Sequence, residues 1–347
     1  MTKTYYIQTF GCQMNELDSE KIAGLMESKG FVPAKNKYKA DTVIINTCSV
    51  RQSAEDRAMG LVENLKKLKP KPKVIMTGCM VSSAEGKRKR YTLPELKENF
   101  SDIDQFVSIG KLLKNFKGEP KRKKKTSAFI SIMKGCDNFC SYCVVPYARG
   151  REVSRPLEEI ACEAENLAKR DYKHITLLGQ NVNSYGKNSK DNFAVLLKKI
   201  NNIKGLEKIS FLTSNPHDLS NDIIRAMKLP KIDRYLHLAV QSGDDKILKQ
   251  MNRKYTTKKY LSLIERIRKE IPEIQIGTDI IVGFPGETKQ QFENTIKLCR
   301  KAKFSLAYIA KYSPRQGTAA YKLKDNISYE EKKRRFRILD KMINKRK

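Results

Sequence analysis

The 347-residue sequence lacks the long apolar run that a membrane helix needs. Such a helix takes about 18–20 consecutive apolar residues, and no stretch here reaches that length. The N-terminus also lacks the pattern of a secretory signal. These absences exclude the membrane and secreted classes, so we expect a cytoplasmic protein that makes no membrane contact. In that compartment, eight cysteines indicate metal binding or catalysis before disulfides.

Acidic residues are scarce relative to basic ones. The chain has 38 Asp and Glu against 70 Lys and Arg, which gives a net charge of +32. An excess of this size favours a polyanionic partner, usually nucleic acid. The simpler interpretation is a lysine-rich composition with solvated faces. The basic runs at residues 87–90 and 117–125 are open to either interpretation.

Three cysteines stand close together after an apolar run at residues 128–133, which we predict to be a strand. They are Cys136, Cys140 and Cys143, and no fourth ligand is nearby, since the next candidates are Cys162 and His174. A 4Fe-4S cluster normally takes four cysteines. The spacing therefore predicts a cluster with one iron left open for another ligand.

Three other kinds of site could use the same cysteines. A structural zinc site would need a second pair of ligands, and none is visible. A redox-active pair would leave Cys136 unused. A disulfide does not suit a chain without a secretory signal.

A second set of cysteines follows strands predicted in the first half of the chain. Strands are predicted at residues 4–10, 42–46 and 73–77, with a fourth at 105–109. Each of the first three ends just before a cysteine, and these cysteines are Cys12, Cys48 and Cys79. Helices between them, at residues 15–29 and up to residue 68, imply a doubly wound parallel sheet. Ligands of such sheets bind outside the carboxyl ends of the strands, so the three thiols should converge. One free cysteine could be simple packing, but three in register are not explained that way.

The second half of the chain repeats the strand–helix alternation. Strands are predicted at residues 128–133, 174–178, 208–212, 235–240, 275–282 and 306–311, with helices at 156–169, 218–227, 256–269 and 289–301. Six such units form a partial (β/α)6 barrel, whose active site should lie at the carboxyl ends of the strands. The fold class is therefore α/β, a doubly wound sheet domain followed by a partial barrel.

We expect four segments along the chain: residues 1–116, a basic linker at 117–126, the barrel at 127–327, and an amphipathic, basic C-terminal helix at 328–347. Cys162 and Cys299 fall in predicted helices and are interpreted as packing. The three histidines, His174, His217 and His237, are isolated in sequence and are interpreted as structural.

The cysteine loop and its surroundings resemble a known family. The Cys136-x3-Cys140-x2-Cys143 spacing is similar to the cluster loop of radical S-adenosylmethionine (SAM) enzymes, and GCDNFCSYCVVPYARGREVSRP (residues 135–156) resembles their methylthiotransferase branch. Further blocks that resemble this branch run from Gly11 to Thr318: GCQMNELDSE, INTCSVR, LLGQNVNSYG, HLAVQSGDDKILKQMNR, GTDIIVGFPGET and YSPRQGT.

The resemblance implies two 4Fe-4S clusters and SAM as cofactors. One cluster would sit at Cys136, Cys140 and Cys143 and bind SAM, and an auxiliary cluster would sit at Cys12, Cys48 and Cys79. The implied reaction puts a methylthio group on carbon 2 of isopentenyl-adenosine beside the tRNA anticodon. One SAM would supply a 5′-deoxyadenosyl radical and a second the methyl group, with sulfur delivered through the auxiliary cluster. Implied partners are the tRNA anticodon loop, a reductase, flavodoxin or ferredoxin as electron donor, and a sulfur donor.

Positions beside the strands and the cysteine loop supply the remaining candidate residues. Contacts with SAM are expected from Tyr142, Gln180, Asn181, Ser214, Gln241, Ser242, Gly283 and Phe284. A polar residue after a strand can also be a simple helix cap. Contacts with tRNA are expected from Tyr147, Arg149, Arg151, Arg155 and Tyr185, with surface ion pairing as the alternative.

The sequence departs from the family pattern in places. Gly179-Gln180-Asn181 stands in place of a common Gly-Gly-Glu element, and this removes the usual carboxylate partner of the SAM ammonium. Ala239 stands where the family commonly has Pro, and Asn215 stands where it often has His. Family members usually continue into a small RNA-binding barrel, the TRAM domain, and this sequence ends at Lys347 without one. Either the basic surface and terminal helix substitute for it, or tRNA affinity is weaker, or the chain is a fragment.

Other functions remain open at this point. Related enzymes act on threonylcarbamoyl-adenosine in tRNA or on an aspartate of a ribosomal protein. A different class would be a non-enzymatic iron–sulfur electron carrier or an RNA-binding module. An electron carrier would want four cysteines per cluster, and each set here has three.

Overall fold

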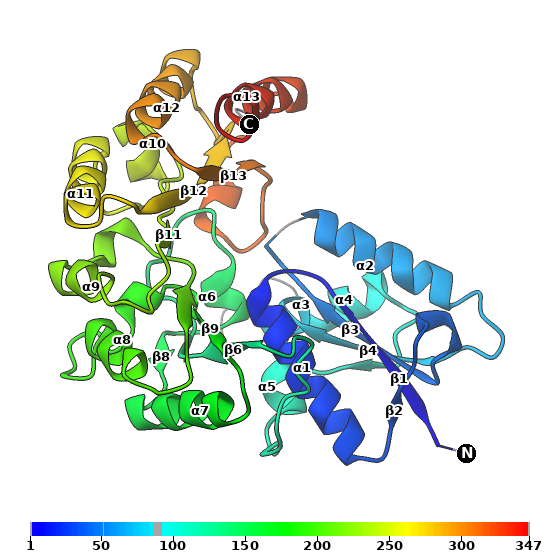
Figure 1. The fold of residues 1–347 in the computed structure, drawn as a ribbon. Coiled ribbons are helices and arrows are strands. Elements are labelled where there is room, and N and C mark those ends of the chain that lie inside the picture. The colour runs from blue at the N-terminus through cyan, green and yellow to red at the C-terminus, as the bar shows by residue number, and fades with distance from the viewer. Residues whose placement is uncertain (1, 51, 86–91, 346–347) are drawn as a thin grey trace. The chain divides into compact units, whose positions relative to one another are not determined.

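A computed structural model describes residues 2–50, 52–85 and 92–345. The chain divides into two compact units (Figure 1). The N-terminal unit is made of Met1–Lys125, Lys134–Asp137 and Cys143–Glu152. The barrel unit is made of Thr126–Met133, Asn138–Tyr142 and Val153–Lys347. The cysteine loop therefore contributes segments to both units. The basic run at residues 87–90 lies outside the described residues.

A five-stranded parallel sheet forms the centre of the N-terminal unit. Its strands are β1 (Thr4–Thr9), β2 (Val32–Pro33), β3 (Thr42–Thr47), β4 (Lys73–Gly78) and β5 (Gln105–Phe106), in the order β2-β1-β3-β4-β5. The three predicted strands that precede cysteines are confirmed. The fourth is shorter than predicted, because Ile109 begins a short helix, α5 (Ile109–Leu112). The two-residue β2 was not predicted.

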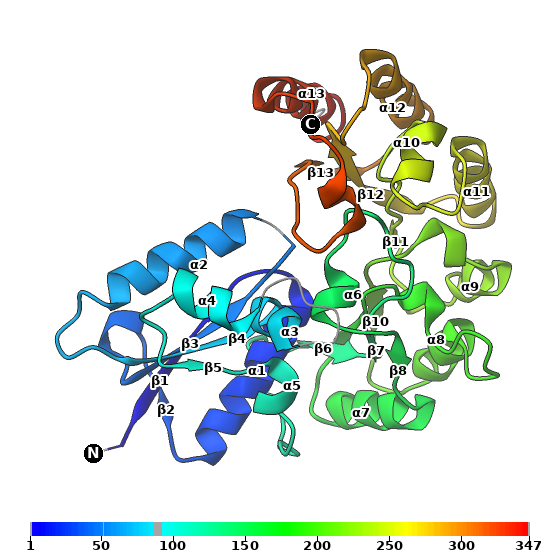
Figure 2. The same cartoon turned by 180° about the vertical axis from the view of Figure 1, so that it is seen from behind.

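Helices cover both faces of this sheet (Figure 2), and they are α1 (Gln13–Ser28), α2 (Gln52–Leu65), α3 (Cys79–Glu85) and α4 (Leu93–Asn99), with a 3-10 turn at Lys37–Lys39. Successive residues of a strand point to opposite faces. Ile44 accordingly packs with Ile22 of α1, whereas Val43 and Ile45 pack with Leu61 of α2. The unit is a doubly wound α/β fold, as predicted.

The strand order creates a crevice at the ends of β1 and β3. The chain runs from β1 to β2 on one side and then crosses to β3 on the other side of β1. At such a reversal the connections leave in opposite directions, and ligands bind there, outside the carboxyl ends of the strands. Cys12 follows β1 and Cys48 follows β3, so both lie at this switch point.

The predicted linker is mostly exposed, but it is anchored to α1. Arg122 is buried and its guanidinium lies 3.1 Å from the Glu20 carboxylate of α1. The backbone amide of Lys123 donates to the same carboxylate at 3.1 Å. A side-chain carbon added to Gly24 would lie 2.4 Å from the carbonyl oxygen of Glu119, so the segment lies directly against α1. Most of the segment is exposed, as its charge suggested, and Arg122 is the residue whose side chain is turned inward.

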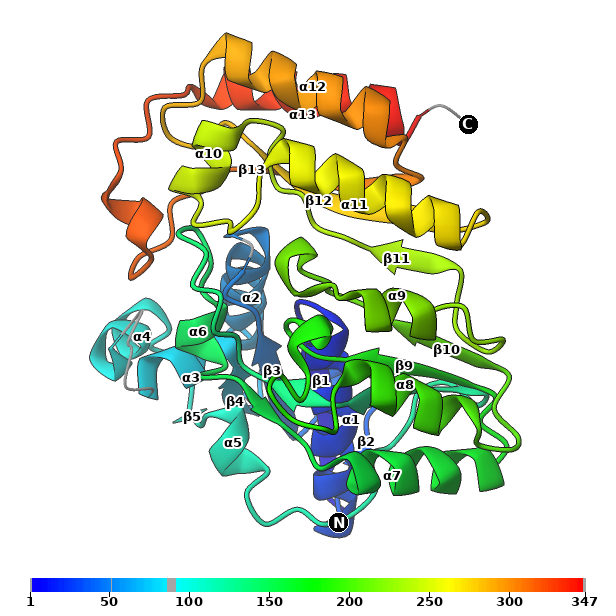
Figure 3. The ribbon, with the colours of Figure 1, turned by 90° about the vertical axis from the view of Figure 1, so that its left-hand side faces the viewer.

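The barrel unit contains six parallel strands that build the barrel (Figure 3). They are β6 (Ser127–Ser131), β9 (His174–Leu178), β10 (Lys208–Phe211), β11 (Tyr235–His237), β12 (Gln275–Val282) and β13 (Leu306–Lys311). They form two three-stranded sheets, β6-β9-β10 and β11-β12-β13. A bridge between Ser214 and Leu238 joins the two sheets into one partial barrel. The predicted (β/α)6 arrangement is confirmed. Two-residue strands, β7 (Met133–Lys134) and β8 (Val153–Ser154), flank the cysteine loop.

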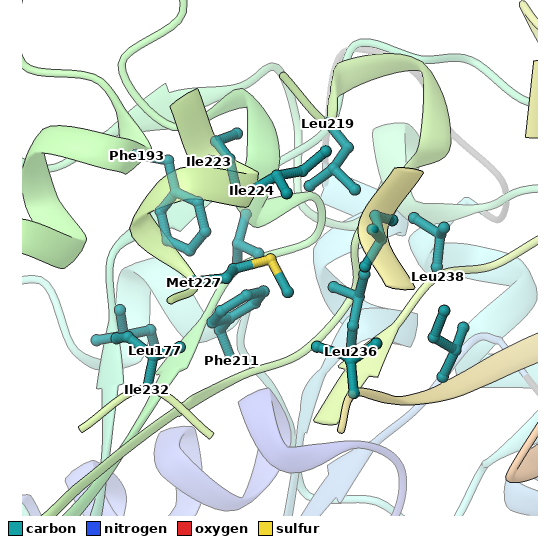
Figure 4. Packing of buried hydrophobic residues seen from close by; sticks show 14 of the residues in the cluster. Leu177, Phe193, Phe211, Leu219, Ile223, Ile224, Met227, Ile232, Leu236 and Leu238 are labelled. Carbon is teal, nitrogen blue, oxygen red and sulfur yellow. The ribbon is translucent and has the colours of Figure 1, made fainter. Parts of the chain in front are cut away.

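Helices pack outside the strands: α7 (Leu157–Lys169), α8 (Phe193–Asn201), α9 (Asn221–Ala226), α10 (Asp245–Gln250), α11 (Thr257–Glu270) and α12 (Lys289–Ala302), with 3-10 turns at Val182–Ser184, Pro216–Asp218 and Ala319–Lys322. Figure 4 shows part of the core between them, where Phe193 and Phe211 meet edge to face with ring centroids 5.1 Å apart. Cys299 is buried in this core, as predicted, and burial raises the pKa of its thiol to about 12. Cys162 is exposed, so its prediction as a packing residue is wrong.

The predicted C-terminal helix is α13 (Tyr329–Ile343), and part of its basic face points inward. Lys332 is buried and lies 2.6 Å from the Asp325 carboxylate, and Arg335 is buried 2.6 Å from Glu287. Arg334 and Arg337 are exposed. The basic outer face is therefore only partly as predicted. In the described part of the chain, no helix combines the length and apolar character required to cross a membrane.

Candidate functional site

The three cysteines of the N-terminal unit follow strand ends that lie close together. Cys12 is the N-cap of α1, and Cys79 is the first residue of α3. Gly11 has φ +124°, and an added side-chain carbon there would lie 2.9 Å from Cβ of Cys48. Gly78 has φ +93°, and the same change would lie 2.4 Å from the carbonyl oxygen of Thr47. Both positions require glycine, because the chain turns in a left-handed conformation against a neighbouring strand end.

Asn15 connects these strand ends and lies between two of the thiols. Its side-chain amide is fully buried and donates to the carbonyl oxygens of Phe10 and Thr47, each at 2.8 Å. Its Oδ1 atom lies 4.0 Å from Sγ of Cys12 and 3.8 Å from Sγ of Cys79. The three cysteines predicted to converge are therefore brought to one place.

Arg149 also reaches this cysteine site. It follows the four-residue helix α6 (Val145–Ala148), which belongs to the N-terminal unit and packs against α3. Its Nη2 atom donates to Oδ1 of Asn15 at 2.6 Å, and Nη1 lies 2.7 Å from the Asp18 carboxylate. The side chain is 11 % exposed. The prediction of a tRNA contact for Arg149 is wrong in this structure, because the guanidinium is turned inward.

Burial and charge act in opposite directions on the pKa of the Cys79 thiol. Burial raises the pKa of the Cys79 thiol to about 11, and the nearby Arg149 guanidinium opposes this rise. Burial would lower the pKa of Arg149, but Cys79 and Asp18 raise it above its ordinary value. The guanidinium is therefore charged, and it favours thiolates beside it.

Three thiols around one point, to which the described residues add no fourth cysteine, suit a cluster with an open corner. A cubane presents a separate iron to each thiolate, so its ligands need not meet at one ion. Within residues 2–50, 52–85 and 92–345, no three His, Cys, Asp or Glu side chains are close enough to hold a single metal ion. The chemistry of the donor set fits the predicted auxiliary 4Fe-4S cluster.

The second cysteine set lies on the loop between β7 and β8. In the N-terminal unit, the backbone amide of Cys136 donates to the carbonyl oxygen of Gly150 at 3.3 Å. In the barrel unit, Asn252 donates from its side chain to the carbonyl oxygens of Asn138 and Phe139, at 3.3 and 2.9 Å. Nη1 of Arg253 lies 3.3 Å from Sγ of Cys140. The loop is thus held by a backbone hydrogen bond, by the Asn252 side chain and by the Arg253 guanidinium.

Buried polar atoms without partners lie at the strand ends of the barrel unit. Ser214 follows β10 and Gln241 follows β11, as predicted for contacts with SAM. Among the described residues, Oγ of Ser214, Oε1 of Gln241 and Oγ of Ser141 have no hydrogen-bond partner. Leaving such buried groups unpaired costs about 1–3 kcal/mol each. These atoms fit a polar ligand that supplies the missing hydrogen bonds.

Asn181 is already used within the protein. Its Nδ2 atom donates to Asp218 at 2.7 Å, and its Oδ1 accepts from the backbone amide of Asn215 at 3.1 Å. Nδ2 of Asn138 on the cysteine loop lies 3.4 Å from the same Asp218 carboxylate. Asp218 was not among the predicted residues, although a carboxylate after the third strand could have been set against the missing Glu beside Gln180. Gln180 itself is half-buried at the end of β9.

The remaining predicted SAM residues lie around the loop after β12. Gly283 has φ +68°, and its amide donates to Glu287 at 2.7 Å. Phe284 is fully buried in an apolar cluster against which Tyr142 packs. Its ring therefore supports the loop, and only its backbone is left for a ligand. Oγ of the buried Ser242 accepts from the amide of Asp244 at 3.3 Å.

The predicted tRNA contacts separate into exposed and buried groups. Tyr185 is 2 % exposed, and its hydroxyl donates to the carbonyl oxygen of Arg155 at 2.8 Å, so its prediction as a stacking residue is wrong. Arg155 donates to the carbonyl oxygen of Ser131 at 2.6 Å, which ties the chain after the loop to β6. Arg151 is exposed and Tyr147 is half-buried, so both stay candidates.

His237 is not isolated. Its Nε2 atom lies 2.9 Å from the Asp279 carboxylate, and Nδ1 lies 3.4 Å from the hydroxyl of Tyr235. The Tyr308 ring lies 5.6 Å from the imidazole, centroid to centroid. The adjacent strands β11, β12 and β13 bring these residues together, which separate positions in the sequence could not reveal. His174 and His217 are exposed.

The comparisons with known proteins agree with this geometry. Residues 130–299 match the Radical SAM superfamily, and residues 4–97 match Uncharacterized protein family UPF0004. A curated relative from Caldicellulosiruptor saccharolyticus, named tRNA-2-methylthio-N(6)-dimethylallyladenosine synthase, is 45% identical over 98% of this chain and 78% of its own length. The chain belongs to the radical SAM methylthiotransferase family. A family member of the same name from Thermotoga petrophila is 44% identical over 99% of this chain and 82% of its own length.

A solved structure supports the fold. The radical SAM methyltransferase TsrM from Kitasatospora setae matches with a TM-score of 0.62 and 14% identity, over 92% of this chain and 75% of that one. Members of the radical SAM superfamily use SAM and a 4Fe-4S cluster, and the cysteine loop described above lies within the matched residues.

Proposed function

We propose that the protein methylthiolates carbon 2 of N6-isopentenyl-adenosine (N6-dimethylallyl-adenosine) beside the tRNA anticodon, using SAM. The observation that carries this proposal is the set of relatives that are 42–45% identical to this chain over nearly its whole length. The two separate three-cysteine sets agree with it. The alternatives within the family act on threonylcarbamoyl-adenosine or on a ribosomal protein, and the curated relatives favour the isopentenyl-adenosine reaction.

Each cysteine set has a separate role in the proposal. Cys136, Cys140 and Cys143 would hold the SAM-binding cluster, and Cys12, Cys48 and Cys79 the auxiliary one. When bound, SAM and the two clusters supply the 5′-deoxyadenosyl radical, the methyl group and the sulfur. The protein's own task is to place these groups and to keep water away from them.

Residues of the barrel unit would bind SAM. Ser214 and Gln241 have the buried, unpartnered oxygens that its amino, carboxylate or ribose groups could satisfy. Asp218, close to Asn138 of the cysteine loop, would take the place of the carboxylate that is missing beside Gln180. The backbone at Gly283 would approach the adenine.

The partners of this reaction follow from its chemistry. The substrate would be the anticodon loop of tRNA, whose bases can be turned out and stacked. A reductase, flavodoxin or ferredoxin would supply electrons, and a separate donor the sulfur. We place the reaction in the cytoplasm, where tRNA is modified.

Mass spectrometry of tRNA nucleosides tests the substrate. A strain without this gene should lose the methylthio derivative of isopentenyl-adenosine and accumulate the unmodified isopentenyl form, and the intact gene should restore it. Loss of methylthio-threonylcarbamoyl-adenosine instead would move the function to the other tRNA branch. An unchanged nucleoside profile would contradict any tRNA reaction.

Cleavage of SAM tests the enzyme class. Reconstituted, reduced protein should form 5′-deoxyadenosine from SAM, and the variant Cys140→Ala should not. No 5′-deoxyadenosine from the intact protein would favour an electron carrier or an RNA-binding module over an enzyme.

A further inference from the structure

The auxiliary cysteine site contains a charged residue that comes from the other cysteine loop. Arg149 lies six residues after Cys143, and the whole segment Cys143–Glu152 belongs to the N-terminal unit. Six residues of chain span at most about 20 Å. One cysteine of the SAM-binding set is therefore connected by a short segment to the cysteines of the auxiliary set.

The guanidinium of Arg149 is fixed in place by two residues of α1. Nη1 lies 2.7 Å from the Asp18 carboxylate, and Nη2 donates to Oδ1 of Asn15 at 2.6 Å. The same Asn15 oxygen lies 3.8 Å from Sγ of Cys79 and 4.0 Å from Sγ of Cys12. A planar, permanently charged group held by two partners keeps one orientation better than a lysine would.

The charge at this site requires a cation. Three thiolates carry three negative charges, and Asp18 adds a fourth. Cys48 and Cys79 are buried, where charges interact more strongly than in water. Asp18 pairs with Arg149 at 2.7 Å, so its own charge is offset by the guanidinium that it holds.

We propose that Arg149 is a positioning residue for the auxiliary cluster. Its guanidinium is held by Asp18 and Asn15, and its positive charge partly offsets the negative charge of the cluster. The segment from Cys143 to Arg149 then connects Cys143 to the auxiliary cysteines within the N-terminal unit. This inference rests on the proposed function, because it requires a cluster at Cys12, Cys48 and Cys79.

The proposal makes a prediction about reduction potential. Reduction adds a negative charge to an iron–sulfur cluster, so a nearby cation favours the reduced state and a nearby anion opposes it. Removing Arg149 should therefore lower the potential of the auxiliary cluster, whereas removing the charge of Asp18 should raise it. A residue that only supports the fold would not produce shifts of opposite sign.

The experiment uses the full chain with Cys136, Cys140 and Cys143 replaced by alanine, so that only the auxiliary cluster is observed. In this background, iron and sulfide per chain and the midpoint potential are measured for Arg149→Met, Arg149→Lys and Asp18→Asn. The matched control is Arg122→Met, which removes another buried arginine of this unit from its pair with Glu20. Glu20 lies about 12 Å along α1 from Cys12, at 1.5 Å per residue.

We expect Arg149→Met to lose iron or to lower the potential by at least the ~59 mV of a tenfold one-electron change. Arg149→Lys should recover part of either loss, Asp18→Asn should raise the potential, and Arg122→Met should match the background. Should Arg149→Met not fold, Asp18→Asn still tests the charge, because its potential should rise above that of the background.

Two results would overturn parts of the account, and they are distinguishable. Full iron content with an unchanged potential in Arg149→Met, or equal shifts in Arg149→Met and Arg122→Met, would reject the role of Arg149 and leave the proposed function standing. A background protein that binds no iron and sulfide at all would reject the auxiliary cluster itself.

Discussion

Arg253 contacts a cysteine of the SAM-binding loop directly. Its Nη1 atom lies 3.3 Å from Sγ of Cys140, while Nη2 donates to the carbonyl oxygen of Ala239 at 2.8 Å and Nε to the hydroxyl of Tyr255 at 2.9 Å. Three partners fix the guanidinium, so its charge stays beside the thiolate. A charged donor of this kind stabilises a thiolate and sets the properties of the cluster bound to it.

We expect Arg253→Met to slow the formation of 5′-deoxyadenosine from SAM by roughly tenfold or more. A hydrogen bond to a charged group contributes about 1.5–3 kcal/mol, and about 1.4 kcal/mol corresponds to a tenfold change in rate. Arg253→Lys should recover part of the rate. Arg268→Met is the control, because Arg268 also donates to carbonyl oxygens, those of Ala302 and Lys303, without touching a cysteine. Equal rates in Arg253→Met and the unaltered protein would refute this role.

Single residues also show what the sequence could not reveal. Spacing was sufficient to predict that Cys12, Cys48 and Cys79 follow strand ends in register, whereas the cluster at Cys136, Cys140 and Cys143 stays a prediction. Arg149 and Tyr185 were assigned to tRNA because their residue types suit RNA, yet both side chains are turned inward. The inward partners, Asp18 and the carbonyl oxygen of Arg155, lie far along the chain or on the backbone, where no sequence pattern marks them.

Helix α13 supports the loop after β12 through two buried cations. Arg335 donates to the Glu287 carboxylate at 2.6 Å, and the same carboxylate accepts the amide of Gly283 at 2.7 Å. The side-chain carbons of Lys332 lie over Gly283, because an added carbon there would be 2.4 Å from Cγ of Lys332. The basic residues of this helix that face inward therefore hold the glycine turn proposed to approach adenine.

We expect Arg335→Met to lower the free energy of unfolding by about 3–5 kcal/mol, because it leaves the Glu287 carboxylate buried and unpaired. Arg334→Met should change it by less than about 1 kcal/mol, since Arg334 is exposed and its ion pair with Glu331 lies at the surface. Burial already raises the pKa of Glu287, so the unpaired carboxyl should take up a proton and the deficit should shrink as the pH falls. Urea unfolding at two pH values measures both effects, and equal losses in the two variants would contradict them.

The alternation of strands and helices was readable from the sequence because each long element has a clear apolar period. The short elements were not, since β2, β7 and β8 have two residues each and depend on neighbouring strands for their hydrogen bonds. The C-terminal helix was located correctly, but which of its basic residues point inward depends on acidic partners at Asp325 and Glu287. Such pairing belongs to the tertiary fold.

At the scale of the whole molecule, the net charge of +32 sets how the protein meets its substrate. Neutralising phosphates releases counterions, so binding weakens as salt rises. About three phosphate contacts would already weaken binding more than tenfold between roughly 50 and 200 mM salt. We expect tRNA binding, measured by filter retention, to show at least this dependence. An affinity that does not change with salt would separate the basic charge from tRNA recognition.

The count of iron and sulfide per chain tests the central claim of two clusters most directly. The reconstituted protein should hold about eight irons and eight sulfides, because each cubane has four of each. Replacing Cys12, Cys48 and Cys79 by alanine should remove about half of both, and replacing Cys136, Cys140 and Cys143 should remove the other half. If one set of replacements removes all the iron, or neither removes any, the chain does not hold two independent clusters.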